Sequence, residues 1–336
     1  MRFRPVIILF AAFAFASLVS CKEEEKTKEY MTGNISVKHE MPPYVKKGDK
    51  YSFTPSGVTA PDGTAVGYYF SAFGKTDTLK NGATSWVLEI PDTLGTFSLS
   101  CAAFPVESSD KYYNTTGYIS FGVVSDDETN GSITNIGRHI GDTKVYIDGR
   151  LFYSFKAGGK DWLRGNLCTI RRDDNGKEVF GRSYAGSPAM QNVFGAYYTW
   201  EEAQTACPTG WHLPTESEWI ELLKEAGAPE GLKVLDSSPC GAGKLMTKAY
   251  FNGAVMWDYY REVTISDQYL SASPVGYCEI GGNQTLFLGY ADYAVFWTAD
   301  EHEGLGVYRY IYKDSDSVYA GTADKQYFGA SVRCVK

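Results

Sequence analysis

Apolar residues in the middle of the chain recur at helical spacing. Four of them fall at positions i, i+3, i+4 and i+7, as on one face of a helix: Trp219, Leu222, Leu223 and Ala226. Thr215 and Glu218, just before this run, have the Thr-x-x-Glu spacing of a capping box, and Thr199 and Glu202 repeat it. The sequence therefore predicts two short, capped helices within residues 196–227.

Upstream of these helices the pattern is that of strands. Runs rich in aromatic and β-branched residues alternate with turn dipeptides, at residues 66–73, 85–90, 97–104 and 118–124. This spacing predicts an all-β sandwich over residues 30–125. Residues 126–138 are polar and have no apolar period, so we expect them to be a linker to a second domain.

The second domain, residues 139–336, combines the helices with further strands. Asp148-Gly149 supplies the positive φ angles of a two-residue turn, which predicts a hairpin over residues 144–155. After an irregular, glycine-rich stretch, four more strands are expected at residues 293–298, 306–313, 318–321 and 326–335. In the second of these, Tyr308, Tyr310 and Tyr312 share one face and Arg309 lies on the other, and one of the two faces must be core.

The first residues have the layout of an export signal. Arg2 and Arg4 precede an apolar run, residues 6–18, which is short for a membrane span. The run ends in Leu-Val-Ser before Cys21, which resembles the bacterial lipobox and implies removal of residues 1–20 and acylation of Cys21. An ordinary signal peptide with an incidental cysteine is the alternative.

Residues 21–29 are charged and have no apolar face, so we expect a disordered tether. The acidic cluster at residues 23–25 resembles the surface-export tag of lipoproteins in the Bacteroidetes. It implies a protein anchored by lipid in the outer membrane and exposed on the cell surface; a solvated tether is the alternative.

The chain carries 32 basic and 40 acidic residues, a net charge of −8, and removal of residues 1–20 would take away Arg2 and Arg4 and make it −10. Such a balance disfavours nucleic acid as a partner, because nucleic-acid binding requires a basic surface.

Segments on and after the predicted helices carry a family resemblance. The Gly-Trp-His-Leu-Pro run at residues 210–214, together with Ser-Val-Arg-Cys-Val at 331–335, resembles the Fibrobacter succinogenes major paralogous domain over roughly residues 140–336. The resemblance implies an α+β C-type-lectin-like fold, which formylglycine-generating enzymes also share. Residues 86–101 resemble immunoglobulin-like or PKD-like modules, whose commoner role is that of a stalk.

Apart from Cys21, six cysteines remain, and six allow fifteen disulfide pairings. The resemblance implies one pair, Cys207 with Cys334. Cys240 and Cys278 flank the irregular region and are the expected second pair. Cys101 and Cys168 are left to bridge the two domains or to stay free.

Catalytic and metal motifs are missing from the sequence. The histidines are scattered, with no His-Glu-x-x-His, no Cys-x-x-Cys and no Gly-x-Ser-x-Gly. The Glu-Pro-Asn, Gln-Pro-Asp and Trp-Asn-Asp triplets of calcium-dependent lectins are missing too. We therefore expect neither an enzyme nor a cofactor nor a metal.

Calcium-free recognition remains, because aromatic rings can contact the C–H faces of sugars while polar side chains bind their hydroxyls. The region expected to supply such a mixture comprises Trp257, Tyr259, Tyr260, Tyr293, Trp297, Asp300, Tyr308, Arg309 and Tyr310. The predicted function is that of a binding or adhesion module for a glycan or a surface protein. A structural component of the cell envelope is the alternative.

Overall fold

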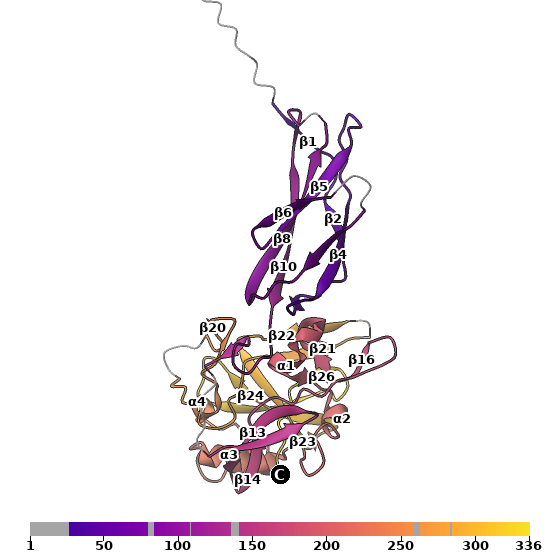
Figure 1. Cartoon of the computed structure of the whole chain (residues 1–336). Coiled ribbons are helices and arrows are strands. Elements are labelled where there is room, and N and C mark those ends of the chain that lie inside the picture. Colours follow the sequence, from indigo (N-terminus) through magenta and orange to yellow (C-terminus); the bar gives the residue numbers. More distant parts are fainter. Residues whose placement is uncertain (1–26, 80–83, 108, 136–140, 259–262, 283) are drawn as a thin grey trace, which may run out of the picture.

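The computed structural model describes residues 27–79, 84–107, 109–135, 141–258, 263–282 and 284–336. The fold is mostly β. Figure 1 shows the strands gathered in two parts that follow one another along the chain: the N-terminal part contains β1 to β10, and the C-terminal part contains β11 to β26 and the helices.

Two sheets, in which most neighbouring strands are antiparallel, face each other in the N-terminal part. One has the order β3 (Tyr44–Val45), β10 (Thr115–Val123), β8 (Gly95–Pro105), β5 (Val66–Ala72) and β6 (Lys75–Thr78). The other has the order β2 (Ser36–Lys38), β4 (Lys50–Ser56) and β7 (Trp86–Glu89). At the end of this part near residue 27, β1 (Glu29–Tyr30) pairs with β9 (Tyr112–Tyr113).

The space between these sheets is filled from both sides. Phe53 and Leu88 of the three-stranded sheet meet Phe70, Leu99 and Phe121 of the five-stranded one, and all five side chains are buried. Burial of a side chain of this size contributes about 1.5–3 kcal/mol. The strands formed where the alternation of apolar residues predicted them.

The junction between the two parts is packed. Tyr44 of β3 lies 5.8 Å from Tyr184 and 6.2 Å from Phe251, measured between ring centroids, and its backbone N–H donates to the hydroxyl of Ser187 at 3.0 Å. Within the segment predicted as a linker, β11 (Ile133–Thr134) pairs with β19 (Tyr250–Phe251). The end of that segment therefore belongs to the C-terminal part, because its backbone completes a sheet there.

The C-terminal part holds several small sheets. The strands between residues 143 and 197 are β12 (Thr143–Ile147), β13 (Arg150–Ala157), β14 (Lys160–Leu163), β15 (Arg171–Arg172), β16 (Glu178–Phe180), β17 (Arg182–Ser183) and β18 (Ala196–Tyr197). Those after them are β20 (Ala254–Val255), β21 (Tyr277–Ile280), β22 (Thr285–Leu288), β23 (Tyr293–His302), β24 (Leu305–Tyr312), β25 (Val318–Ala323) and β26 (Phe328–Gly329). Two sheets shape the candidate site: β23-β24-β25 and β22-β21-β26.

The helices are short: η1 (Tyr184–Gly186), η2 (Pro188–Met190), α1 (Gln191–Phe194), α2 (Trp200–Ala203), α3 (Glu216–Glu225) and α4 (Ala242–Leu245). Both predicted capping boxes are present. The hydroxyl of Thr215 accepts from the backbone N–H of Glu218 at 3.2 Å, and the Glu218 carboxylate accepts from that of Thr215 at 2.8 Å. Thr199 and Glu202 do the same for α2.

One disulfide joins the segment after α2 to the end of the chain: Cys207 is bonded to Cys334, 127 residues later. The other predicted pair is not formed, since Cys240 and Cys278 are both free. The thiol of Cys240 donates to the carbonyl of Gly227 at the end of α3, whereas Cys278 is buried in β21 opposite Gly329. Cys278 thus belongs to the core, whereas Cys240 lies outside it beside the end of α3. Cys101 and Cys168 are also free.

In the described part of the chain, the buried apolar residues run from Met31 to Val335. A chain that begins at residue 22 therefore keeps every described core residue. Within the described ranges, none of the helices has the length and apolar character needed to cross a membrane.

Candidate functional site

Two tryptophans of the predicted binding region are core residues. Trp257 and Trp297 are at most 1% exposed, and each indole N–H donates to a backbone carbonyl at 2.8 Å, that of Ala272 and that of Tyr198 respectively. With its polar atom satisfied internally, a buried tryptophan stabilises the core. Neither ring is available to a ligand at the surface.

Arg309 is also a core residue. It is fully buried and paired with Glu216, the first residue of α3, through Nε to Oε1 at 2.8 Å and through a second contact between Nη2 and Oε2. A third bond runs from Nη1 to the carbonyl of Asp236 at 2.6 Å. Asp300 has a related role, because its carboxylate accepts from the backbone N–H of Glu216 at 2.6 Å. Both residues thus fix the start of α3.

Three of the predicted residues do come together at the surface. Tyr293, Tyr308 and Tyr310 are half-buried and lie on one side of the sheet β23-β24-β25. Tyr259 and Tyr260 lie outside the described residues. We call this side of the sheet the tyrosine face; its members, all half-buried, are Tyr293, Tyr308, Tyr310, Tyr312 and Tyr319. The buried Val295 and Trp297 lie on the same side, opposite Tyr310 and Tyr308.

Strand register builds the tyrosine face. Tyr293 is directly opposite Tyr312, and Tyr310 is directly opposite Tyr319, so their side chains project to the same side of the sheet. Tyr308 is opposite Gly321. A Cβ atom at Gly321 would lie 2.6 Å from the Tyr308 ring, so this ring rests directly on the backbone of the glycine.

The rings form a packed layer. Tyr310 and Tyr319 are stacked with centroids 5.0 Å apart, Tyr293 and Tyr312 are 5.0 Å apart, and Tyr308 and Tyr310 are 5.8 Å apart. Because each ring supports its neighbours, little side-chain entropy remains to be lost when a partner binds. The face is therefore ordered in advance of any contact.

The hydroxyls of Tyr308 and Tyr310 are neutral at physiological pH. Burial raises the pKa of Tyr308 and of Tyr310, and the neighbouring tyrosines raise it further. A neutral phenol both donates and accepts hydrogen bonds. Two hydroxyls at the edge already have partners: Tyr312 donates to Asp314 at 3.2 Å, and Tyr319 shares a hydrogen bond of 2.9 Å with Ser315.

A groove of about 570 Å³ adjoins the tyrosine face. It is lined by Glu279, Ile280, Gly281, Gln284, Leu286, Ala323, Asp324, Tyr327 and Phe328. Phe328 connects the two surfaces, because its ring is stacked with that of Tyr308 at 5.2 Å and with that of Tyr277 at 5.1 Å. The two small sheets thus present one continuous surface.

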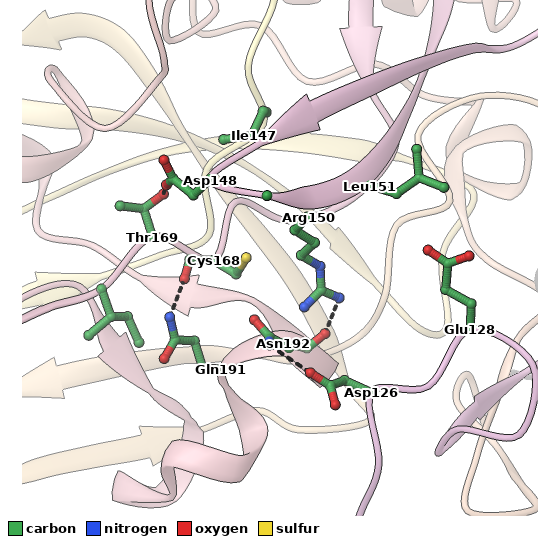
Figure 2. Close-up of a pocket in the computed structure, with 12 residues that line it drawn as sticks. Asp126, Glu128, Ile147, Asp148, Arg150, Leu151, Cys168, Thr169, Gln191 and Asn192 are labelled. Atoms are coloured by element: carbon green, nitrogen blue, oxygen red, sulfur yellow. Dashed lines mark hydrogen bonds between the residues drawn. The ribbon is translucent and has the colours of Figure 1, made fainter.

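A second, more polar cavity of about 660 Å³ lies where the chain enters the C-terminal part (Figure 2). Its lining comprises Asp126, Glu128, Ile147, Asp148, Gly149, Arg150, Leu151, Cys168, Thr169, Ile170, Gln191 and Asn192. We call it the polar cavity.

Many polar groups of this cavity bind one another. Thr169 donates to Asp148 at 2.8 Å, Asn192 donates to Asp126 at 2.6 Å, and Arg150 donates to the carbonyl of Asn192, as Figure 2 shows. Groups that already have partners gain less from a ligand than free ones.

Nucleophilic chemistry is not favoured in the polar cavity. Burial raises the pKa of the Cys168 thiol, and this outweighs the opposite effect of the nearby Arg150. The residue is therefore a thiol at neutral pH, and thiols are poor nucleophiles compared with thiolates.

His212 has a structural position. It contacts Glu218 at 2.9 Å, and its backbone pairs with that of Val335, so it lies in the framework that holds α3 and the end of the chain. Among the residues that the structure describes, no group of three or more His, Cys, Asp or Glu side chains is placed to hold a metal ion.

Sequence reasoning missed Tyr277, Tyr319 and Phe328. The alternation of Tyr308, Tyr310 and Tyr312 was visible, but the other rings come from strands that meet β24 only in the folded chain. For Tyr319 and Phe328 the signal was an aromatic residue in another predicted strand, whereas Tyr277 lies in the stretch predicted to be irregular.

A comparison with protein families gives a match over residues 155–336, to the model of the Fibrobacter succinogenes major domain. The matched range contains the disulfide, the tyrosine face and the groove. A search of curated proteins gave no match to the chain.

Proposed function

This chain belongs to the Fibrobacter succinogenes major domain family, and on that premise we propose that it is a non-catalytic binding or adhesion module of the bacterial cell surface. Recognition in this proposal is independent of calcium. The observation that carries it is the tyrosine face, an ordered layer of half-buried aromatic rings with phenolic hydroxyls on one side of the sheet β23-β24-β25.

The proposed architecture is an immunoglobulin-like sandwich followed by a C-type-lectin-like domain. Two facing sheets around one core support the first half of this proposal. For the second half, the support is the disulfide between the segment after α2 and the last residues, together with the capped helices α2 and α3. In this arrangement the sandwich acts as a stalk and the C-terminal part as the recognition head.

We also propose that Cys21 carries the lipid anchor and that the acidic residues after it direct the protein to the outer face of the outer membrane. Replacement of Cys21 by alanine is expected to abolish incorporation of radiolabelled palmitate and to release the protein from the membrane fraction, because several acyl chains are needed for stable anchoring. A variant that stays in the membrane without label would contradict the lipid anchor. Lys22→Ala is the matched control.

Tyrosine-rich surfaces suit recognition for a physical reason. A tyrosine presents a large apolar area and a hydroxyl while it has few rotatable bonds, so contact gains affinity at a small entropic cost. Residues of this kind are enriched among those whose truncation weakens binding most. A glycan and a surface protein are both ligands that such a face can accept.

The proposal predicts the effect of truncating the face. The double variant Tyr310→Ala/Tyr319→Ala should bind its ligand at least tenfold more weakly, which corresponds to about 1.4 kcal/mol. Ligands are found by applying the chain from residue 22 on to arrays of glycans and of surface proteins, and affinities are then measured for each hit. Tyr146→Ala, at a tyrosine 69% exposed on β12, is the control, and it should bind as the wild type does.

Equal affinities of the wild type, Tyr310→Ala/Tyr319→Ala and Tyr146→Ala for the ligand would contradict the assignment of recognition to the tyrosine face. Blank arrays, together with a stable complex between the chain and other envelope proteins, would favour the structural role instead. Melting temperatures measured alongside show whether either variant has lost its fold.

A further inference from the structure

We propose that the groove beside the tyrosine face is the docking site for a protein segment that carries a lysine or arginine next to apolar side chains. This inference rests on the proposed function, since it names the partner of the same surface. The inference is based on the side chains that project from the outer face of the sheet β22-β21-β26.

Register places one carboxylate in an apolar row. Glu279 of β21 is directly opposite Leu286 of β22 on one side and Phe328 of β26 on the other, so the three side chains share one face of the sheet. The neighbouring row, Cys278 and Gly329, is buried. The row with Glu279 therefore forms the outer surface, and Leu286 is 48% exposed there.

A second carboxylate lies at the rim. Asp324 accepts hydrogen bonds from the backbone N–H groups of Gln326 and Tyr327 at 2.8 and 2.9 Å, and these bonds lower the pKa of Asp324. It is thus charged at neutral pH. Among the described residues that line the groove none is basic, and the adjacent Lys325 is directed at Glu301 and the ring of Trp200.

The carboxylates of Glu279 and Asp324 indicate which side chains the partner carries. Lysine and arginine lay an aliphatic stem along an apolar surface while the charged group reaches a carboxylate. Leu286 and Ile280 offer the apolar surface, and Glu279 offers the carboxylate. A cationic side chain with apolar neighbours is therefore complementary to the groove in both shape and charge.

A protein segment fits better than a sugar. Carbohydrate recognition by aromatic residues uses open ring faces, but Phe328 is stacked with Tyr277 and with Tyr308, at interplanar angles of 20° and 19°. The apolar contact that remains comes from aliphatic side chains and from Tyr327, which is 63% exposed. Aliphatic side chains pack well against other aliphatic side chains.

A carboxylate on an exposed sheet surface can also have another purpose, which is to prevent association between sheets. In that case Glu279→Gln would make the chain self-associate and would leave peptide binding unaffected. The two roles are thus separable by experiment.

The test uses fluorescence anisotropy with short labelled peptides and the chain from residue 22 on. One peptide alternates lysine with valine, a second alternates glutamate with valine, and a third alternates lysine with serine. We expect the lysine–valine peptide to bind at least tenfold more tightly than either of the others, with an affinity that falls as salt rises.

Two variants locate the site. Glu279→Gln/Asp324→Asn removes both charges, and asparagine keeps an oxygen that can accept the two backbone hydrogen bonds of the turn; binding should weaken at least tenfold. Leu286→Asn should weaken it too, because a polar, uncharged side chain replaces the apolar surface on which the apolar neighbour would pack. Val255→Asn on β20, at a valine 49% exposed, is the matched control and should change nothing.

Three results would overturn the inference: no binding of the lysine–valine peptide, equal binding of all peptides, or unchanged binding by Leu286→Asn. If such a result occurs while Tyr310→Ala/Tyr319→Ala still loses an array ligand, the face recognises another class of ligand and the proposed function stands. If neither set of variants changes any binding, both proposals fail.

Discussion

Replacing Glu216 by alanine is expected to lower the free energy of unfolding by about 3–5 kcal/mol. The carboxylate is fully buried and pairs with the guanidinium of Arg309, which is fully buried as well. It also accepts from the backbone N–H of Leu235 at 3.0 Å. Without it, a cation would remain in the core with no opposite charge. Urea denaturation followed by far-ultraviolet circular dichroism measures the loss.

The control for this experiment is another glutamate of the same helix. Glu221 pairs with Lys224 at 2.7 Å on the surface and is 51% exposed in its side chain, so Glu221→Ala should cost less than about 1 kcal/mol. A double change to methionine, Glu216→Met/Arg309→Met, should recover much of the stability, because an apolar pair replaces a desolvated ionic one. Equal losses for Glu216→Ala and Glu221→Ala would show that the ion pair is not part of the core.

Removing the disulfide is expected to cost about 2–5 kcal/mol. The bond between Cys207 and Cys334 closes a loop of 127 residues, and in the chain-entropy model a long loop contributes most because the unfolded chain loses most freedom. Denaturation of the wild type and of Cys207→Ser/Cys334→Ser, each with and without reductant, measures this cost. Reductant should lower the midpoint of the wild type and leave that of the double variant unchanged.

Cys240→Ser is the control, since Cys240 is a free thiol and should respond to reductant as the wild type does. Mass spectrometry of the non-reduced protein should find the peptide of Cys207 linked to that of Cys334. A midpoint that does not depend on reductant, or a linkage of Cys207 to any other cysteine, would contradict the structure at this point.

The local features of this fold could be predicted well. Capping boxes depend on residues three positions apart, and both are present at Thr199 and Thr215. Alternating runs became strands, since alternation reflects which face of a sheet is buried. The pairing of Cys207 with Cys334 followed from a family resemblance and is confirmed.

The features that depend on distant partners could not be predicted. Arg309 was expected near a ligand because polar side chains can bind sugar hydroxyls, but its partner Glu216 lies 93 residues earlier and nothing local connects them. Trp257 and Trp297 were expected to be accessible because aromatic rings can contact the C–H faces of sugars. Their burial depends on how the loops and sheets pack over them. The periodicity of the sequence does not predict this packing.

The candidate site was predicted in part. Alternation along β24 showed that the tyrosines share a face opposite Arg309, yet it could not show which face is core. In the structure both faces pack on core residues: Arg309 pairs with Glu216 on one side, and the half-buried tyrosines pack against Val295 and Trp297 on the other. The groove requires three strands that meet only in the tertiary structure, so it has no signal in any single segment.

The central claim is that recognition occurs on the tyrosine face, and binding isotherms of three proteins test it most directly. They are the wild type, Tyr310→Ala/Tyr319→Ala, and Glu128→Gln/Asp148→Asn, which removes two charges from the polar cavity. We predict at least a tenfold loss of affinity for the tyrosine variant, measured below its melting temperature, and wild-type affinity for the cavity variant. Loss of affinity in the cavity variant, with full binding by the tyrosine variant, would contradict the claim.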